Sequence, residues 1–208
     1  MSEPRPSLFV VSAPSGAGKS TVLARVLAAD PQLRFSISHT TRAPRSGERD
    51  GVHYHFVGRP ACDELIRRDA MLEWADVHGH LYGTSRAELE LAEREERDLL
   101  LDVDVQGAAQ VRQRVPESVS VFLFPPSFGD LERRLRGRGL DGPEVIERRL
   151  RNARGEVEAY RGYDYVVVND DLDRAVDALK CVIGAARCRR SRVEAEAERI
   201  LGSFRARD

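Results

Sequence analysis

Runs of consecutive apolar residues mark the strands that the sequence predicts. A continuous apolar run is typical of a strand that is covered on both faces of its sheet. Four such runs are Leu8 to Val11, Leu99 to Val103, Val119 to Phe124 and Tyr165 to Val168. The sequence therefore predicts a sheet whose strands are buried between two layers of other elements.

Helical periodicity occupies stretches that lie between or after these strands. Apolar residues recur three and four positions apart from Thr21 to Ala29, where Asp30 and Pro31 end the pattern, and again from Asp171 to Ala186. This spacing places the apolar side chains on one stripe of a helix. Because strands that alternate with helices form parallel sheets, the sequence predicts an α/β fold with a doubly wound parallel core.

The first interruption of this alternation spans residues 39–97. It opens with a polar loop at 40–51. Short strand patterns follow at His53 to Val57, Leu72 to Val77 and His80 to Tyr82. A helix is predicted from Ser85, because Ser85 and Glu88 have the spacing of a capping box. The pattern predicts a small mixed lobe inserted after the second strand of the core.

The second interruption, residues 126–161, has the pattern of two helices separated by Gly137, Gly139 and Gly142. It carries nine arginines and no lysine. Hinging glycines beside a dense positive face are what a helical lid over phosphate groups requires. For any single one of these arginines, a solvated helix face is the better interpretation.

Composition and charge narrow the classes of protein. A length of 208 residues favours a single domain, and a formal net charge of -1 argues against a generally basic protein that coats nucleic acid. The N-terminal residues lack the apolar region of a signal peptide, and no stretch reaches the length of a membrane span. We therefore expect a cytoplasmic protein that binds neither nucleic acid nor membrane, with no evident obligate protein partner.

The cysteines and the basic C-terminal stretch add little chemistry. Cys62, Cys181 and Cys188 lack the spacing of a metal site or a disulfide framework, so we expect free, mostly buried thiols. The stretch from Arg187 to Arg192 is basic, and a frayed surface helix is a better interpretation of it than a nucleic-acid contact.

The strongest chemical signal follows the first apolar run. Gly16 and Gly18 precede Lys19 and Ser20, in the pattern of a phosphate-binding loop between a strand and a helix. Ala13 stands where the strict pattern has its first glycine, which weakens the match only slightly. In such a loop the backbone N–H groups surround the phosphates, the lysine reaches the β- and γ-phosphates, and the serine hydroxyl ligates Mg²⁺. The predicted nucleotide contacts are Ala13, Pro14, Ser15, Gly16, Ala17, Gly18, Lys19, Ser20 and Thr21.

The choice of lysine at position 19 supports this interpretation over a plain glycine-rich turn. Lysine occurs only at positions 19 and 180, whereas 31 of the 33 basic residues are arginine. A compact ammonium fits inside a backbone cradle, whereas a planar guanidinium is too broad to replace it freely. The presence of lysine at position 19, in a chain that otherwise uses arginine almost throughout, therefore supports a phosphate-binding role.

Residues of the inserted lobe indicate which molecule receives the phosphoryl group. Arg42 and Arg45 lie on one loop with Tyr54 shortly after, a set that can bind a second phosphate. Glu73 follows on a predicted strand, with Tyr82 and Thr84 further along. A carboxylate can accept hydrogen bonds from N1–H and the exocyclic amine of guanine, whereas adenine presents an acceptor at N1. The lobe is thus suited to a guanine monophosphate.

Taken together, these stretches resemble the guanylate kinase family, whose members transfer the γ-phosphoryl group of ATP to GMP. The matching stretches are 12–21, 38–45, 51–56, 73–74, 82–84, 101–107 and 168–172, and they run through nearly the whole chain. The resemblance implies a core of phosphate-loop NTPase type, an inserted monophosphate-binding lobe and a helical lid. It implies ATP as phosphoryl donor, GMP as substrate and Mg²⁺ as cofactor.

The resemblance also implies a role for individual residues. GMP would be held by Ser38, Arg42, Arg45, Tyr54, Glu73, Tyr82 and Thr84. The expected catalytic set is Lys19 and Arg42 with the lid arginines Arg134, Arg138 and Arg149. Asp102 would orient Mg²⁺ through water or contact the guanine, and an ordinary polar strand end is the alternative for it. Asn169 and Asp170 would lie near the adenine, although a turn before a helix accounts for them almost equally well.

These interpretations divide the single domain into parts. We expect the core at about 1–38, 98–125 and 162–190, the GMP-binding lobe at about 39–97, the lid at about 126–161 and a helical tail at about 187–208. Two alternatives stay open. One is an interaction module related to guanylate kinases that has lost its phosphate loop, which the intact Lys19 and Ser20 oppose. The other is a phosphate-loop kinase for a different acceptor, such as a sugar bisphosphate, which Glu73 beside the arginine pair opposes.

Overall fold

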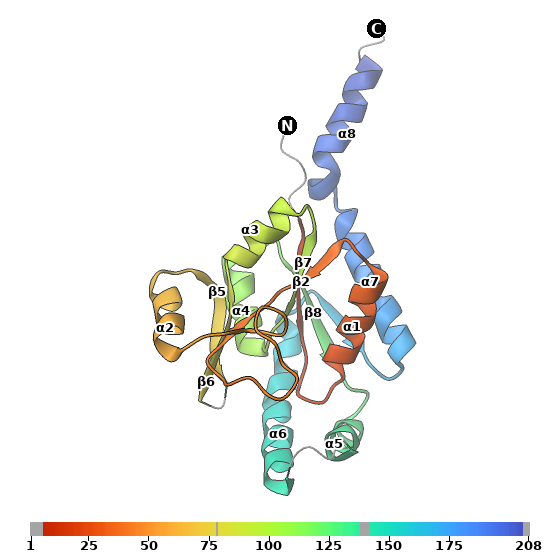
Figure 1. Ribbon diagram of the computed structural model, residues 1–208. Helices are drawn as coiled ribbons and strands as arrows, with labels where there is room; N and C mark the ends of the chain where they lie inside the picture. The colour runs from red at the N-terminus through yellow and green to blue at the C-terminus, as the bar shows by residue number, and fades with distance from the viewer. Residues whose placement is uncertain (1–5, 78, 138–141, 206–208) are drawn as a thin grey trace.

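Five strands form the core sheet of the computed structural model, which describes residues 6–77, 79–137 and 142–205. The strands run in the order β2-β7-β1-β8-β9, and every neighbouring pair is parallel (Figure 1). Their bounds are Leu8–Ser12 for β1, Leu33–Phe35 for β2, Asp98–Asp102 for β7, Val119–Phe124 for β8 and Tyr165–Val168 for β9. The prediction of a parallel α/β core is confirmed.

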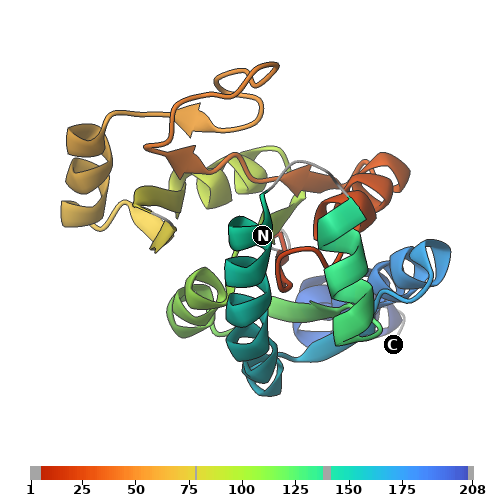
Figure 2. The same ribbon diagram turned by 90° about the horizontal axis from the view of Figure 1, so that it is seen from below.

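Helices cover both faces of this sheet. Phe9 and Val11 of β1 belong to one buried cluster, while Leu8 and Val10 belong to another, as the alternation of side chains along a strand requires. The first cluster packs against α1 and α7, and the second against α3 and α4 (Figure 2). These helices span Lys19–Ala29, Leu172–Arg187, Ala87–Arg94 and Val105–Arg114, in that order.

A second sheet lies beside the core and belongs to the inserted segment (Figure 2). Its order is β4-β3-β6-β5, with a parallel β3–β4 pair and antiparallel β3–β6 and β5–β6 pairs. The strands are β3 at His39–Thr40, β4 at His55–Phe56, β5 at Met71–Val77 and β6 at His80–Ser85, and α2 spans Arg59–Arg67. Gln110 of α4 exchanges hydrogen bonds with the backbone of Trp74, so the sheet is fastened to the core.

Two helices stand below the carboxyl ends of the core strands in Figure 1. They are α5 at Phe128–Gly137 and α6 at Pro143–Glu156, and the 3-10 helix η1 follows at Val157–Gly162. Leu131 and Leu135 of α5 form a separate buried cluster with Ile146 and Leu150 of α6. The pair therefore has its own small core, as a segment that moves as a unit would need. Gly139, one of the three predicted hinge glycines, lies outside the described residues.

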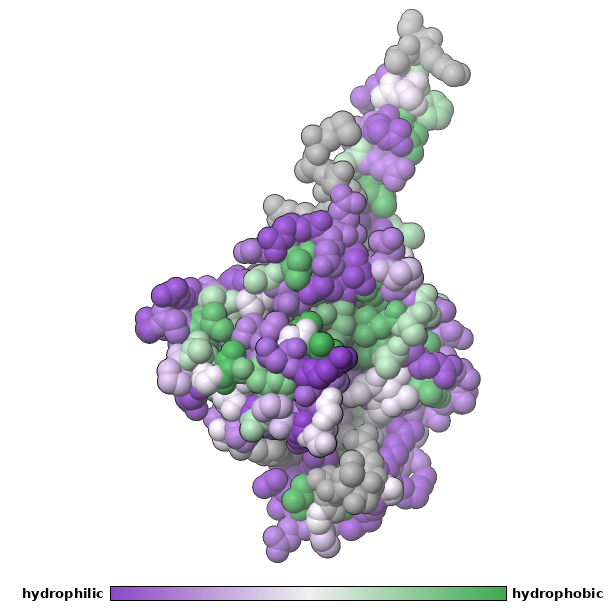
Figure 3. All heavy atoms as spheres, viewed as in Figure 1, coloured by the Kyte–Doolittle hydropathy of each residue, from purple (hydrophilic) through white to green (hydrophobic). Residues whose placement is uncertain are grey.

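The last helix, α8 at Arg190–Arg205, extends away from the body (Figures 1 and 3). Its first turn is anchored, because the Asp98 carboxylate pairs with both Arg187 at 2.7 Å and Arg192 at 3.3 Å. No residue of α8 is buried, which agrees with the expected surface helix. The helix is continuous from Arg190 to Arg205 and is not frayed over this range. Among the described residues, no helix has both the length and the apolar character that a membrane crossing requires.

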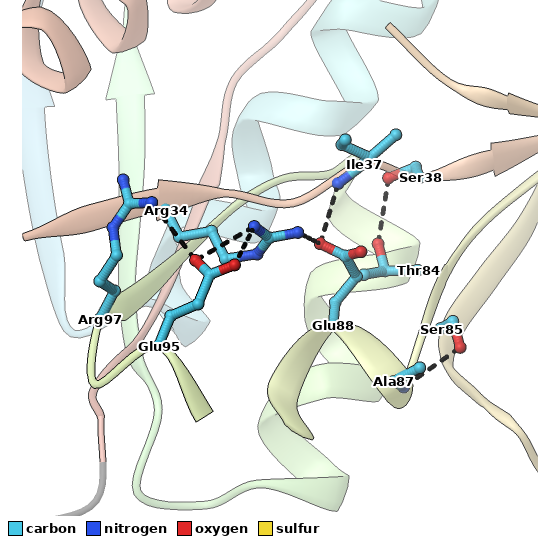
Figure 4. Close-up of polar contacts among 9 residues, drawn as sticks. All are labelled: Arg34, Ile37, Ser38, Thr84, Ser85, Ala87, Glu88, Glu95 and Arg97. Atoms are coloured by element: carbon cyan, nitrogen blue, oxygen red, sulfur yellow. Dashed lines mark hydrogen bonds and ion pairs between the residues drawn. The ribbon is translucent and has the colours of Figure 1, made fainter. Parts of the chain in front are cut away.

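The predicted capping box does not form. Ser85 is the last residue of β6, and α3 begins at Ala87, whose N–H donates to Ser85 Oγ at 3.2 Å (Figure 4). Glu88 is buried, and its carboxylate accepts a hydrogen bond of 3.1 Å from the N–H of Ile37 and lies 3.5 Å from Arg34. The carboxylate therefore stabilises the distant segment before β3 instead of the start of its own helix.

The expectation of mostly buried thiols is also wrong. Cys62 is buried between α2 and its sheet, whereas Cys181 and Cys188 are exposed on the C-terminal helical segment. The apolar stripe of α7 uses neighbouring positions such as Leu179 and Ile183, so Cys181 falls on the solvent side of the helix.

Candidate active site

The loop between β1 and α1 has the backbone shape of an anion cradle. Gly16 and Gly18 have φ angles of 96° and 93°, in the left-handed region that glycine adopts without strain. A Cβ atom would lie 2.9 Å from the Leu135 side chain at Gly16 and 2.4 Å from Asn169 Nδ2 at Gly18. Helix α1 begins at Lys19 without a side-chain cap. Its first N–H groups and its positive dipole end are thus available to an anion.

Lys19 lies against the carboxyl end of the neighbouring strand β7. Its Nζ is 2.5 Å from Asp102 Oδ1 and donates a hydrogen bond of 2.8 Å to the carbonyl of Val103. Ser20 and Thr21 follow in the first turn of α1 and are exposed. The structure therefore places Lys19 beside Asp102, as the chain order of the core strands implies.

Asp102 and Asp104, the two acids at the end of β7 and just after it, have different partners. Asp102 pairs with Lys19. Asp104 is the N-cap of α4, because its Oδ1 accepts a hydrogen bond of 2.8 Å from the N–H of Gly107. A capping carboxylate satisfies one of the first N–H groups of a helix, so Asp104 has a structural role that its position after a strand did not reveal.

A cavity of about 170 Å³ lies between the core and the inserted sheet. Its walls include Tyr54, Glu73 and Tyr82 from the inserted segment, and Lys19, Ser38 and Asp102 from the core. A larger groove of about 740 Å³ lies at the start of α8, beside Leu8 and Val119 at the amino ends of the core strands. Ligands of open α/β sheets bind at the carboxyl ends, so the smaller cavity is the candidate site.

Glu73 is the most buried acid of this cavity, with only 4% of its surface exposed. Its Oε1 accepts a hydrogen bond of 2.7 Å from the hydroxyl of Thr84, which lies 3.1 Å from the hydroxyl of Ser38. Burial raises the pKa of Glu73 to about 7, Asp104 adds to the shift, and Thr84 and Lys19 oppose it. The site thus holds a carboxyl group that ionises near neutral pH.

The first turn of α4 presses directly against this carboxyl group. A Cβ atom at Gly107 would lie 2.5 Å from Glu73 Oε2. No side chain other than the hydrogen of glycine fits there without moving the carboxylate, so Gly107 defines where the Glu73 side chain can stand.

Arg42 of the polar loop contacts Tyr82, one of the residues that line this cavity. Its Nε donates a hydrogen bond of 3.0 Å to Tyr82 OH, and its Nη2 lies 2.8 Å from Glu48 Oε1. Glu48 Oε2 also accepts a hydrogen bond of 2.7 Å from the backbone N–H of Arg45. The bond from Arg42, and then that from Arg45, lowers the pKa of Glu48 to about 2. Glu48 thus braces the loop that carries both arginines, while the Arg45 residue itself is exposed.

Two of the residues expected on the donor side converge on the carbonyl of Ala17. Arg134 donates from Nη1 to the Ala17 oxygen at 3.0 Å and from Nη2 to the Asn169 carbonyl at 2.8 Å. The side chain of Asn169 donates from Nδ2 to the same Ala17 oxygen at 2.7 Å. A cavity of about 450 Å³ opens beside Gly18, Thr21 and these side chains.

The other expected donor-side residues are placed differently. Asp170 faces the start of α7, where Oδ1 accepts from the N–H of Asp171 at 2.7 Å and Oδ2 lies 3.1 Å from Arg174. Arg149 is half-buried in α6, and Arg138 lies outside the described residues. The structure thus brings Arg134 and Asn169 to the phosphate loop and turns Asp170 away from it.

Comparison with known proteins identifies the family. A sequence model described as Guanylate kinase matches residues 5–186. The chain belongs to the guanylate kinase family. A guanylate kinase from Syntrophotalea carbinolica is 52% identical over 194 residues, which cover 93% of this chain and 92% of that protein. One from Neisseria meningitidis serogroup A is 51% identical over 186 residues, which cover 89% of this chain and 91% of that protein.

The fold agrees with this family. The crystal structure of guanylate kinase from Anaplasma phagocytophilum superposes with a TM-score of 0.74 at 32% identity, covering 91% of this chain and 90% of that one. Guanylate kinases are nucleoside monophosphate kinases that use ATP, so the predictions of a phosphate-loop fold and of a kinase are confirmed. The intact geometry at Gly16, Gly18 and Lys19 leaves no support for an interaction module that has lost its phosphate loop.

Sequence reasoning missed three acids that support the site of this guanylate kinase family member. Glu48 braces Arg42, and its only signal was its place on the same polar loop. Glu88 holds the backbone before Ser38, but its spacing suggested a cap. Glu156, at the end of α6, accepts a hydrogen bond from the N–H of Ser15 in the phosphate loop, and burial raises its pKa. No local pattern announces Glu156, because its partner is far away in the chain.

Proposed function

We propose that this chain is a guanylate kinase that transfers the γ-phosphoryl group of ATP to GMP and gives ADP and GDP, a step of purine nucleotide metabolism. The observation that carries the proposal is the buried carboxyl group of Glu73, which accepts a hydrogen bond from Thr84 and lines a cavity together with Lys19 of the phosphate loop. A base-reading acid next to a phosphate cradle is what phosphorylation of a guanine monophosphate requires.

The acceptor would enter the cavity with its base toward Glu73. The ionised carboxylate can accept hydrogen bonds from both N1–H and the 2-amino group of guanine, while Ser38 presents a hydroxyl at the cavity wall and Thr84 holds the Glu73 carboxylate from behind it. Its phosphate would lie toward the polar loop. There we assign Arg42, Arg45, Tyr54 and Tyr82 to the acceptor phosphate. Arg42 would exchange its contact with Glu48 for a bidentate phosphate contact.

The donor would bind across the phosphate loop, with its triphosphate on residues 13–21. Lys19 already stands at the mouth of the acceptor cavity, held by Asp102, so it can contact phosphate oxygens between the two substrates. The donor set also fits Mg²⁺, because Ser20 offers a hydroxyl and Asp102 a partly exposed carboxylate, both hard oxygen ligands. Bound Mg²⁺ would neutralise charge on the transferred phosphoryl group.

Catalysis would rest on positioning and charge neutralisation. The phosphate of GMP has a second pKa of about 6, so it is already a competent nucleophile at neutral pH and needs no general base. Lys19 and Arg42, with the lid arginines Arg134, Arg138 and Arg149, would offset the negative charge of two polyanions. Closure of α5 and α6 would exclude water, which otherwise would hydrolyse ATP.

The remaining predictions extend this proposal. We assign the GMP-binding lobe to about residues 39–97 and the lid to about 126–161, around a core of about 1–38, 98–125 and 162–190. The four-stranded sheet and the α5–α6 pair support this division. The cytoplasmic location and the absence of a nucleic-acid, membrane or obligate protein partner stay predictions.

A coupled assay of ADP formation with a panel of acceptors tests the proposal. GMP should exceed AMP in kcat/KM by about a hundredfold to more than ten-thousandfold, because two charged hydrogen bonds of roughly 1.5 to 3 kcal/mol each are lost with AMP. A sugar bisphosphate in the same panel tests the alternative acceptor. Equal rates with AMP and GMP, or preference for the sugar, would overturn the assignment.

A further inference from the structure

The carbonyl of Ala17 is the meeting point of three segments that are distant in the chain. It accepts a hydrogen bond of 2.7 Å from Asn169 Nδ2, at the end of β9, and one of 3.0 Å from Arg134 Nη1, in α5. Arg134 Nη2 donates in addition to the backbone carbonyl of Asn169 at 2.8 Å, which closes a ring of three contacts. Asn169 is 5% exposed and Ala17 is 1% exposed, so the bond between them is buried, whereas Arg134 is half-buried.

This ring fixes the orientation of one peptide plane in the phosphate loop. In a trans peptide the carbonyl oxygen and the following N–H point in opposite directions. Two donors that hold the Ala17 oxygen therefore also hold the N–H of Gly18 pointing away from them. Gly18 can hold its N–H in this direction because glycine adopts a φ angle of 93° without strain. An N–H held in this way is part of a preorganised anion cradle.

The packing around the ring leaves little freedom for it to rearrange. Leu135 and Leu131 of α5 press on Gly16, where a Cβ atom would meet them at 2.9 and 3.1 Å. The amide of Asn169 fills the space above Gly18. Both terminal nitrogens of Arg134 are engaged with backbone carbonyls, so a turn toward a phosphate would break two hydrogen bonds. Helix α5 is thus a wall of the phosphate loop in this structure.

We infer that Asn169, together with Arg134, is a positioning residue that holds the phosphate loop in its binding shape through the Ala17 carbonyl, and that this role is independent of the nucleotide base. The inference rests on the proposed function only for the identity of the donor. It predicts that loss of the Asn169 amide weakens every ligand that places phosphates in the loop, whether or not that ligand carries adenine.

Binding of two probes to the full-length chain tests this, without any need for turnover. Calorimetry would measure the affinity for ADP. Displacement of bound ADP would measure the affinity for inorganic tripolyphosphate, which has no base. Asn169→Ala should weaken both probes by the same factor, about tenfold, the scale of one buried hydrogen bond. GMP affinity should be unchanged, because the Asn169 side chain is bonded to the phosphate loop and is not among the residues around the acceptor cavity.

The chain offers a matched control and a second variant. Its other asparagine, Asn152, is exposed on α6, and Asn152→Ala should leave both affinities unaltered. Arg134→Gln should weaken both probes as Asn169→Ala does, and the double variant should lose less than the product of the two factors, because both side chains serve one carbonyl. Asn169→Ser, which keeps a hydroxyl donor, replaces Asn169→Ala if melting curves show that the alanine variant does not fold.

The possible results separate clearly. Equal weakening of ADP and tripolyphosphate supports the inference, even if the acceptor assay were to exclude GMP. Weakening of ADP alone would show that Asn169 contacts the adenine and would overturn the inference. Unchanged binding of both probes would overturn it as well.

Discussion

The substitution Glu73→Gln should stabilise the free protein at alkaline pH while it removes guanine recognition. The glutamate is 4% exposed, and its hydrogen-bond partner is the neutral hydroxyl of Thr84. Burial raises its pKa from 4.5 to about 7. The folded protein therefore favours the neutral form of the Glu73 carboxyl group, whereas in the unfolded chain this group has its ordinary pKa of 4.5. A glutamine keeps the size of the side chain and carries no charge at any pH.

The magnitude follows from the two pKa values. Between pH 4.5 and 7 the folded state binds more protons at Glu73 than the unfolded state, so the free energy of unfolding falls as the pH rises. A difference of roughly 2.5 pKa units corresponds to about 3 kcal/mol, fully expressed above pH 8 and absent below pH 4. The stability of Glu73→Gln relative to wild type should therefore rise by about 3 kcal/mol across this window.

Urea denaturation of both proteins at pH 4.5, 6, 7 and 8 measures this difference. Only the change of the difference with pH matters, because the packing of the amide contributes equally at every pH. Glu198→Gln, at an exposed position of α8, controls for the loss of one surface charge and should show a flat difference. A difference for Glu73→Gln that is the same at pH 4.5 and pH 8 would refute the claim that burial holds the acid neutral.

The same acid links GMP binding to pH. Guanine donates its two hydrogen bonds only to the carboxylate, so GMP binding should release about half a proton from Glu73 at pH 7. GMP affinity should weaken about tenfold on going from pH 8 to pH 6, in addition to the effect of the phosphate's own pKa of about 6. In Glu73→Gln only the phosphate effect should remain. Calorimetry in two buffers of different ionisation enthalpy measures both quantities.

Three further substitutions test other parts of the site. Lys19→Ala should lower kcat by several orders of magnitude with folding intact, and Lys19→Arg should be almost as poor, so near-normal turnover of either would contradict the cradle. Gly107→Ala should raise the KM for GMP more than tenfold, because the new methyl displaces the Glu73 carboxylate, whereas Gly184→Ala, a helical glycine with open space around it, should not. Glu48→Ala should raise the KM for GMP about tenfold with less change in kcat, because the loop that carries Arg42 and Arg45 loses the hydrogen bond from the Arg45 N–H to Glu48, and an unaltered KM would show that this bond is dispensable.

The core elements could be predicted because their signals are local. The strand at Leu8–Ser12 and the helix at Leu172–Arg187 carry apolar patterns that only a covered strand and an amphipathic helix satisfy. Helix α4 was not predicted, since its sequence from Val105 is rich in glutamine and small residues. It forms because Asp104 caps it and because Ala108 and Val111 pack on the core sheet, and neither fact is visible in a short window.

The site could be predicted where one residue type has one chemical use. Glycines before Lys19 indicated a phosphate loop, and the backbone at Gly16 and Gly18 has the shape that such a loop needs, while the guanine-reading role of Glu73 stays a prediction. The supporting contacts could not be predicted, because they join segments far apart in the chain. Glu88 has the spacing of a cap, but its buried carboxylate bonds to Ile37, and Glu156 reaches the phosphate loop from the end of α6. Asn169 was expected near adenine, yet its amide is bonded to Ala17.

In the free site, some of the cations that would bind phosphate are paired with carboxylates, whereas the acid that would bind guanine has a hydroxyl as its partner. Two of the cations that we assign to phosphate are paired with a carboxylate, Lys19 with Asp102 and Arg42 with Glu48, which keeps these two positive charges compensated while no anion is bound. Incoming phosphates can replace these carboxylates, because both are partly exposed and water can solvate them once released. Glu73 is treated differently, with a hydroxyl as its partner and its charge suppressed by burial. A cation paired with Glu73 would occupy the lone pairs that guanine needs, so a neutral acid that ionises as guanine binds is the arrangement that leaves the base-reading position open.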